Sequence, residues 1–114
     1  MQAITTIDNS AYQKFSYILD DGKTAKITLR FLPTQHRWVL DIKDENGFEA
    51  SGVFVCCHPN ILDKWNNIIK YGINISTDDK CDPSMQTDFS SRYAFFSILN
   101  EDEKNEATRY LNGL

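Results

Sequence analysis

The side chains best suited to metal binding or nucleophilic catalysis are three cysteines and two histidines. Cys56, Cys57 and His58 are consecutive, and Cys81 follows in a polar stretch. Structural zinc sites usually take paired ligands separated by two to four residues, whereas adjacent residues at a strand end point to opposite sides. His36 or His58 could activate a thiol, but no local signature of a cysteine nucleophile is present. The sequence therefore predicts no metal site, no cofactor and no catalytic residue.

Paired carboxylates and large aromatic side chains offer two further kinds of chemistry. The pairs Asp20-Asp21, Asp44-Glu45 and Asp78-Asp79 all lie in segments with turn composition, where Asp bonds to nearby backbone. A sugar-binding face would need an exposed row of aromatic rings. Trp38 instead alternates in phase with its apolar neighbours, and Trp65 falls on an apolar helical face. The pattern favours turn positions for the carboxylates and core positions for both tryptophans.

Length and charge limit the classes of protein to which the chain can belong. Its 114 residues suit one domain, and a net charge of -4 gives no domain-wide basic field for nucleic acid. No apolar stretch approaches membrane-spanning length, and the N-terminus lacks the basic and apolar regions of a signal peptide. Three cysteines without a framework spacing fit a reducing compartment. We therefore expect one domain, residues 1–114, made in a cytoplasm and without a nucleic-acid or membrane partner.

Apolar residues alternate with polar ones over several short segments, which predicts antiparallel strands. Turn residues separate the segments at Asp20-Asp21-Gly22, at Pro33 and at Asp44-Glu45-Asn46-Gly47. A fourth strand is predicted from about Phe48 to Cys56, and its Ser51-Gly52 pair indicates a bulge or a close backbone approach. The alternating apolar residues of the first three strands are Phe15, Tyr17 and Leu19, then Ile27, Leu29 and Phe31, then Trp38, Leu40 and Ile42.

The period changes after Pro59-Asn60, where apolar residues recur at helical spacing. We expect a connecting helix that Asn60 caps and Gly72 ends, then a short strand over residues 72–76 and a polar loop over residues 77–88. The segment 92–99 is apolar on both faces, which predicts a central or covered strand. Asn100 and Glu103 have the spacing of a capping box, which predicts a short C-terminal helix near residues 101–112. The predicted fold class is mainly β, a bent antiparallel sheet or small β-barrel with these two helices.

Several ordered segments carry a resemblance to a known family. They are residues 13–22, 27–31 and 37–42, followed by Asp44-Glu45-Asn46-Gly47 and Ser51-Gly52-Val53. This set resembles the small phage baseplate plug family of contractile-tailed phages. Cys81-Asp82-Pro83 is similar to the family's Gly-Asp-Pro loop, with cysteine in place of glycine. The resemblance covers residues 12–99, and residues 100–114 form a helical extension.

The resemblance implies a structural virion protein without enzymatic activity, placed in the tail baseplate. It implies contacts with hub, spike or tail-tube proteins and several copies per virion. From the residue pattern, the candidate interface residues are Phe54, Phe96, Tyr110, Leu111 and Leu114. The last three could instead cover the chain's own sheet. A small carbohydrate- or receptor-binding β-module and a small hydrolase are the alternative functions.

Overall fold

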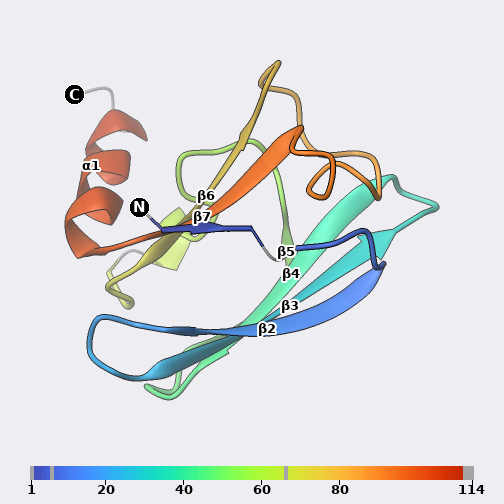
Figure 1. The fold of residues 1–114 in the computed structure, drawn as a ribbon. Coiled ribbons are helices and arrows are strands. Elements are labelled where there is room, and N and C mark those ends of the chain that lie inside the picture. Colours follow the sequence, from blue (N-terminus) through green and yellow to red (C-terminus); the bar gives the residue numbers. More distant parts are fainter. Residues whose placement is uncertain (1, 6, 66, 112–114) are drawn as a thin grey trace.

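The computed structural model describes residues 2–5, 7–65 and 67–111, which fold into two antiparallel sheets and one α-helix (Figure 1). The first sheet has the order β2-β3-β4-β5, and the second has the order β1-β7-β6. The mainly β prediction is confirmed. The elements are β1 (Gln2–Ile4), β2 (Tyr12–Ile18), β3 (Thr24–Leu32), β4 (Arg37–Asp44), β5 (Glu49–Phe54), the 3₁₀ helix η1 (Asp63–Trp65), β6 (Gly72–Thr77), β7 (Ala94–Leu99) and α1 (Glu101–Leu111).

The two sheets share one hydrophobic core, and a backbone bridge after β5 joins them at one side. Phe15 of β2 packs edge to face on Phe96 of β7, with 5.7 Å between the ring centroids. His58, which follows β5, exchanges backbone hydrogen bonds of 3.0 and 3.1 Å with Ile75 of β6. No pairing joins β1 to β2 within the described residues. The strands therefore form two bent sheets and do not close into the small barrel considered as an alternative.

The meander from β2 to β5 follows the predicted hairpins. Antiparallel pairing places Phe31 opposite Trp38, and the register shifts between Leu40 and Ile42 where β4 meets β5. Gly52 lies at this irregularity with a φ of 68°, a backbone conformation that favours glycine. The bulge predicted near Gly52 is confirmed.

Trp38 is the centre of the core. Its side chain is 0% exposed. Its ring lies 5.4 Å from that of Phe31 and 5.5 Å from that of Phe89, measured between centroids. Its Nε1 donates a hydrogen bond of 3.1 Å to the backbone oxygen of Met85. The indole therefore ties β4 to the loop before β7, and its predicted core position is confirmed.

The connecting helix predicted after Asn60 is reduced to the three residues of η1 within the described part of the segment. Asn60 is fully buried, and its Oδ1 accepts 3.0 Å hydrogen bonds from the backbone N–H groups of Leu62 and Ile73. An amide that bonds to nearby backbone favours a turn over a helix. Gly72 begins β6 against this side chain, and a Cβ there would lie 2.7 Å from Asn60 Oδ1. A tertiary contact therefore overrides the helical spacing.

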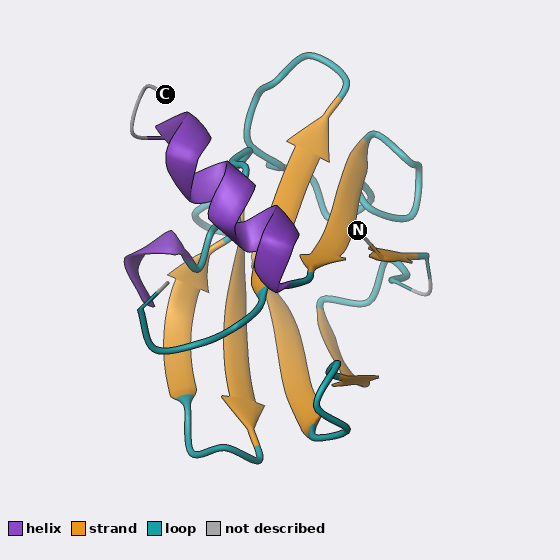
Figure 2. Cartoon of the chain, turned by 90° about the vertical axis from the view of Figure 1, so that its left-hand side faces the viewer, coloured by secondary structure: helices purple, strands orange, loops and turns teal. Residues whose placement is uncertain are grey.

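The second sheet and α1 complete the fold. β7 lies between β1 and β6, so its predicted central position is confirmed, whereas the sequence pattern gave no indication of β1. Glu103 N–H donates to Asn100 Oδ1 (2.9 Å), and Asn100 N–H donates to Glu103 Oε1 (3.1 Å), which confirms the capping box. Figure 2 shows α1 lying across the connection between β5 and β6. Lys104 Nζ donates to the Ile69 carbonyl there (3.0 Å). No helix in the described residues is long and apolar enough to cross a membrane.

Candidate interaction surfaces

The cysteines and histidines are not assembled into a reactive site. Burial, then the nearby charge of Asp82, raises the pKa of the Cys56 thiol. The charge of Asp79 raises the pKa of the exposed Cys81 thiol. Both effects disfavour the thiolate, the form that attacks substrates and binds metals. His58 Nδ1 accepts a hydrogen bond of 3.0 Å from the backbone N–H of Asn60. Within the described ranges, no cluster of three or more His, Cys, Asp or Glu side chains could hold a metal.

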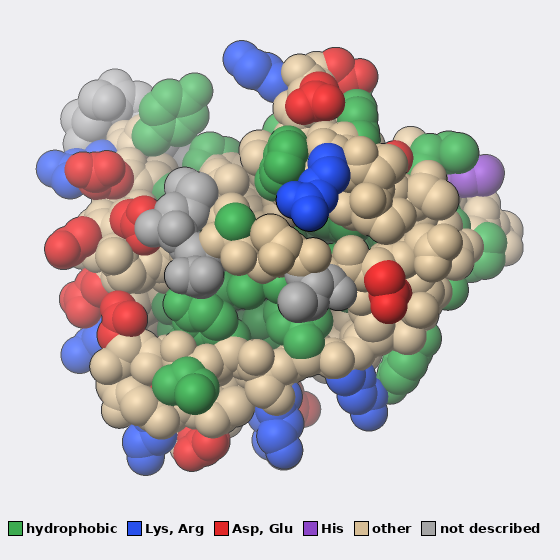
Figure 3. All heavy atoms as spheres, in the orientation of Figure 1, with side chains coloured by type: hydrophobic (Ala, Val, Ile, Leu, Met, Phe, Trp, Pro, Cys, Tyr) green, Lys and Arg blue, Asp and Glu red, His purple; other side chains and the backbone are tan. Residues whose placement is uncertain are grey.

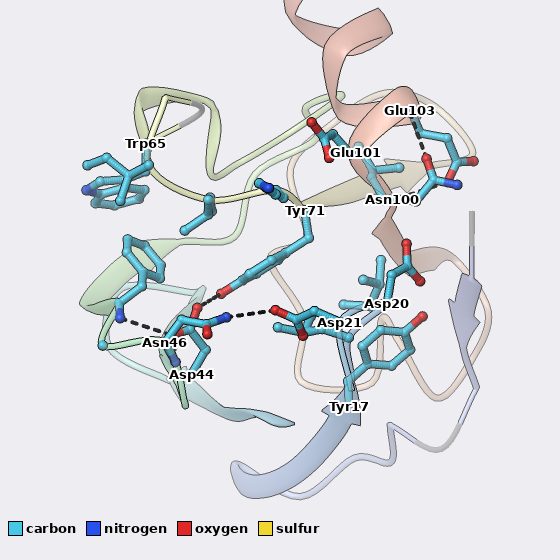
Figure 4. Close-up of a pocket in the computed structure, with 18 of the residues that line it drawn as sticks. Tyr17, Asp20, Asp21, Asp44, Asn46, Trp65, Tyr71, Asn100, Glu101 and Glu103 are labelled. Carbon is cyan, nitrogen blue, oxygen red and sulfur yellow. Dashed lines mark hydrogen bonds between the residues drawn. The ribbon is translucent and has the colours of Figure 1, made fainter. Parts of the chain in front are cut away.

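An open pocket of about 1020 Å³ lies where four segments meet (Figure 4). The segments are the end of β2 with its turn, the β4–β5 turn, the connection before β6, and the β7–α1 junction. Lys70 is the one lysine or arginine among the described residues that line it. The lining includes six carboxylates and four aromatic rings: Asp20, Asp21, Asp44, Glu49, Glu101 and Glu103, with Tyr17, Phe48, Trp65 and Tyr71.

A hydrogen-bonded network around Asp44 holds one wall of the pocket. Asp44 is buried, and its Oδ1 accepts 2.9 Å bonds from the backbone N–H groups of Asn46 and Phe48. The Tyr71 hydroxyl donates to Asp44 Oδ2 at 2.9 Å, and Asn46 Nδ2 donates to Asp21 Oδ2 at 3.0 Å (Figure 4). Burial, followed by the bond to Asp44, raises the pKa of Tyr71 far above its usual range. The turn carboxylates Asp21 and Asp44 therefore position backbone and side chains.

Trp65 packs against the core from the pocket and is partly buried. Its ring lies 5.6 Å from that of Phe48, edge to face, and the Lys64 ammonium lies 4.8 Å from its centroid. The sequence pattern predicted a core position for Trp65 because it assumed a longer helix. The short η1 instead leaves this indole at the pocket.

The predicted interface residues lie in different environments. Phe54 is 48% exposed at the end of β5, and Tyr110 is 72% exposed on α1. Phe96 is 1% exposed in the core, so it is not available at the surface of this chain. Leu111 ends α1, but its side chain lies outside the described part of the structure, as does the whole of Leu114. Phe54 and Tyr110 therefore carry the candidate interface.

Sequence reasoning did not find the pocket, because its lining comes from segments far apart in the chain. The one signal in the sequence was the acidic composition of the turns and of the start of α1. Figure 3 shows acidic side chains gathered on the flank that carries α1, whose first turn contributes Glu101, Asp102 and Glu103.

A comparison with known protein families found one family whose model matches this chain. A family model described as "Cyanophage baseplate Pam3 plug gp18" matches residues 1–101. The match spans all the strands from β1 to β7 and leaves most of α1 outside it. A search of curated proteins found no match. The resemblance noted over residues 12–99 is thereby confirmed and extends to the N-terminal strand. The chain belongs to this family of phage baseplate plugs, which are structural components of the phage tail.

Proposed function

We propose that this chain is a non-enzymatic baseplate protein that assembles with hub, spike or tail-tube proteins. It is made in the host cytoplasm and is present in several copies per virion. The observation that carries the proposal is the family match over every strand of the fold. The raised thiol pKa values of Cys56 and Cys81 are consistent with a binding role instead of a catalytic one. The net charge of -4 likewise argues against nucleic acid as a partner.

Phe54 and Tyr110 are the residues best placed to contact a tail partner. The Arg37 guanidinium lies 4.3 Å from the centroid of the Phe54 ring, so a half-buried arginine stacks on an exposed aromatic ring. Aromatic residues and arginine are enriched at the centres of protein interfaces. Tyr110 is a second exposed ring, on α1, which lies mostly beyond the family match. We propose both residues as contacts and assign Phe54 the larger contribution.

The test is to mix the full chain with the hub, spike and tail-tube proteins of the same phage and measure complex mass by light scattering. We expect a defined complex with at least one of them. Phe54→Ala should weaken that complex about tenfold or more, the effect of removing a buried aromatic contact. Tyr110→Ala should weaken it less.

Phe95→Ala is the matched control, because Phe95 is an exposed phenylalanine, 41% exposed, on a different strand. Its affinity should match that of the unaltered chain. If the chain binds none of the three tail proteins, the assembly proposal is refuted. Equal binding by the Phe54→Ala and Phe95→Ala variants would instead remove Phe54 from the interface.

A carbohydrate- or receptor-binding role is the second candidate, and one observation favours it. Trp65 is partly exposed at an open pocket that also carries carboxylates, and ligand pockets combine aromatic side chains with a few polar groups. If this role holds, a glycan array should show binding that Trp65→Ala abolishes and Phe54→Ala preserves. If the array shows no binding, the carbohydrate-binding role is refuted and the structural role is the remaining candidate.

A further inference from the structure

Among the described residues, the outer edge of β2 carries a row of backbone groups without a strand partner. β2 pairs with β3 alone within the described residues. Phe31 N–H donates to the Ala11 carbonyl (2.7 Å) and Leu19 N–H donates to the Lys23 carbonyl (2.8 Å), so the odd-numbered residues of this segment bond to β3. In an antiparallel pair, the alternate residues direct their N–H and C=O groups away from the partner strand. The groups that face outward therefore belong to Tyr12, Lys14, Ser16 and Ile18.

β2 carries one of the features that protect sheet edges, the charge of Lys14, and lacks the others. Natural sheets block edges with short strands, prolines, bulges or charged side chains, lysine above all. β2 is seven residues long, keeps an unbroken register with β3, and has Lys14 as its single charge. Figure 1 shows it near the lower border of the molecule. Its inward residues Phe15 and Tyr17 are only half-buried, whereas the inward residues of β3 are buried. The part of the chain that the structure describes therefore leaves this edge without a partner strand.

The strand is complementary to itself in one register. If two copies pair antiparallel about Phe15, Tyr12 of one copy lies opposite Ile18 of the other. These are exposed apolar side chains, 58% and 70% exposed, at the two ends of the strand. Lys14 then lies opposite Ser16, and all the outward backbone groups of both strands find partners.

The two neighbouring registers that keep the same hydrogen-bonding pattern have less favourable side-chain pairs than the register centred on Phe15. A shift by two residues in one direction places Lys14 opposite Lys14 of the other copy, and like charges directly opposite are unfavourable. The opposite shift places Lys14 against Ile18 and leaves Tyr12 without a partner. We propose that two copies of this chain pair through β2, centred on Phe15, to form one continuous eight-stranded sheet. This pairing goes beyond the proposed tail assembly and does not depend on it.

The test is sedimentation equilibrium of the full chain over a wide concentration range, with two substitutions of opposite charge at Ser16. Ser16 is exposed and lies opposite Lys14 of the other copy in the proposed register. Because the contact occurs twice, Ser16→Glu should tighten the dimer about tenfold and Ser16→Lys should weaken it about tenfold. Ser51 is exposed on β5, at the other edge of the sheet. Ser51→Lys adds the same charge there and should leave the affinity of the dimer unchanged.

The outcomes distinguish pairing at β2 from a charge effect within one chain and from pairing at β5. Ser16 also lies opposite Lys26 in its own chain, so urea unfolding of each variant at high dilution measures the intrachain effect separately. A chain that stays monomeric at all concentrations overturns the proposal. A dimer with the same affinity in both Ser16 variants also overturns it, and a dimer weakened only by Ser51→Lys would place the contact at β5.

Discussion

Replacing Trp38 with alanine should lower the free energy of unfolding by about 3–5 kcal/mol, the range for truncating a fully buried large aromatic residue. The indole is 0% exposed and contacts Phe31 and Phe89, so its loss leaves a cavity between the sheets. It also removes the donor to the Met85 carbonyl, which fixes the loop before β7. A domain of this size has a total stability of about 5–15 kcal/mol, so the variant should be close to unfolding.

Urea unfolding followed by circular dichroism measures this loss. Trp38→Phe is the control that keeps the experiment quantitative if the alanine variant does not fold. It retains an aromatic ring but loses the Nε1 donor and some volume, so we expect a smaller loss, about 1–2 kcal/mol. Equal stability of Trp38→Ala and the unaltered chain would contradict the assignment of Trp38 as the centre of the core.

Replacing Asp44 with alanine should have the second largest effect, a loss of about 2–5 kcal/mol in the free energy of unfolding. The carboxylate accepts from the N–H groups of Asn46 and Phe48 and from the Tyr71 hydroxyl, and it is 6% exposed. Its removal leaves three donors without their acceptor at the pocket wall. Glu49→Ala, which removes an exposed carboxylate of the same pocket, is the matched control and should change stability little.

Tyr71→Phe measures how much the Tyr71 hydroxyl alone contributes to stability, because this contribution depends on pH. Burial and the bond to Asp44 raise the pKa of Tyr71 above its ordinary value of 10.0 in the folded chain. The stability contributed by this group is therefore fully present below pH 10 and falls as the pH rises toward the folded pKa. The unaltered chain should be more stable than Tyr71→Phe by a constant amount at neutral pH, and the advantage should shrink above about pH 10. An advantage that stays constant through alkaline pH would refute the burial of this hydroxyl against Asp44.

The sequence alone determined the features that depend on neighbours within a few residues. Alternation gave the three long strands of the meander, and turn residues such as Gly47 gave the ends of the hairpins. The bulge at Gly52 and the capping box of Asn100 and Glu103 could be predicted because their residues are close in sequence. The ordered phrases of the meander were also sufficient to indicate the family.

Only the tertiary structure decided the features that join distant segments. Asn60 accepts a bond from Ile73, thirteen residues away, and this contact replaces the expected helix with turns. Phe54 and Phe96 were equal candidates from their alternation, yet one is exposed and the other is buried by the opposite sheet. Alternation with a period of two shows that a strand has two faces, but the packing of other segments decides which face is covered. The pocket and the open edge of β2 were not predicted from the sequence for the same reason.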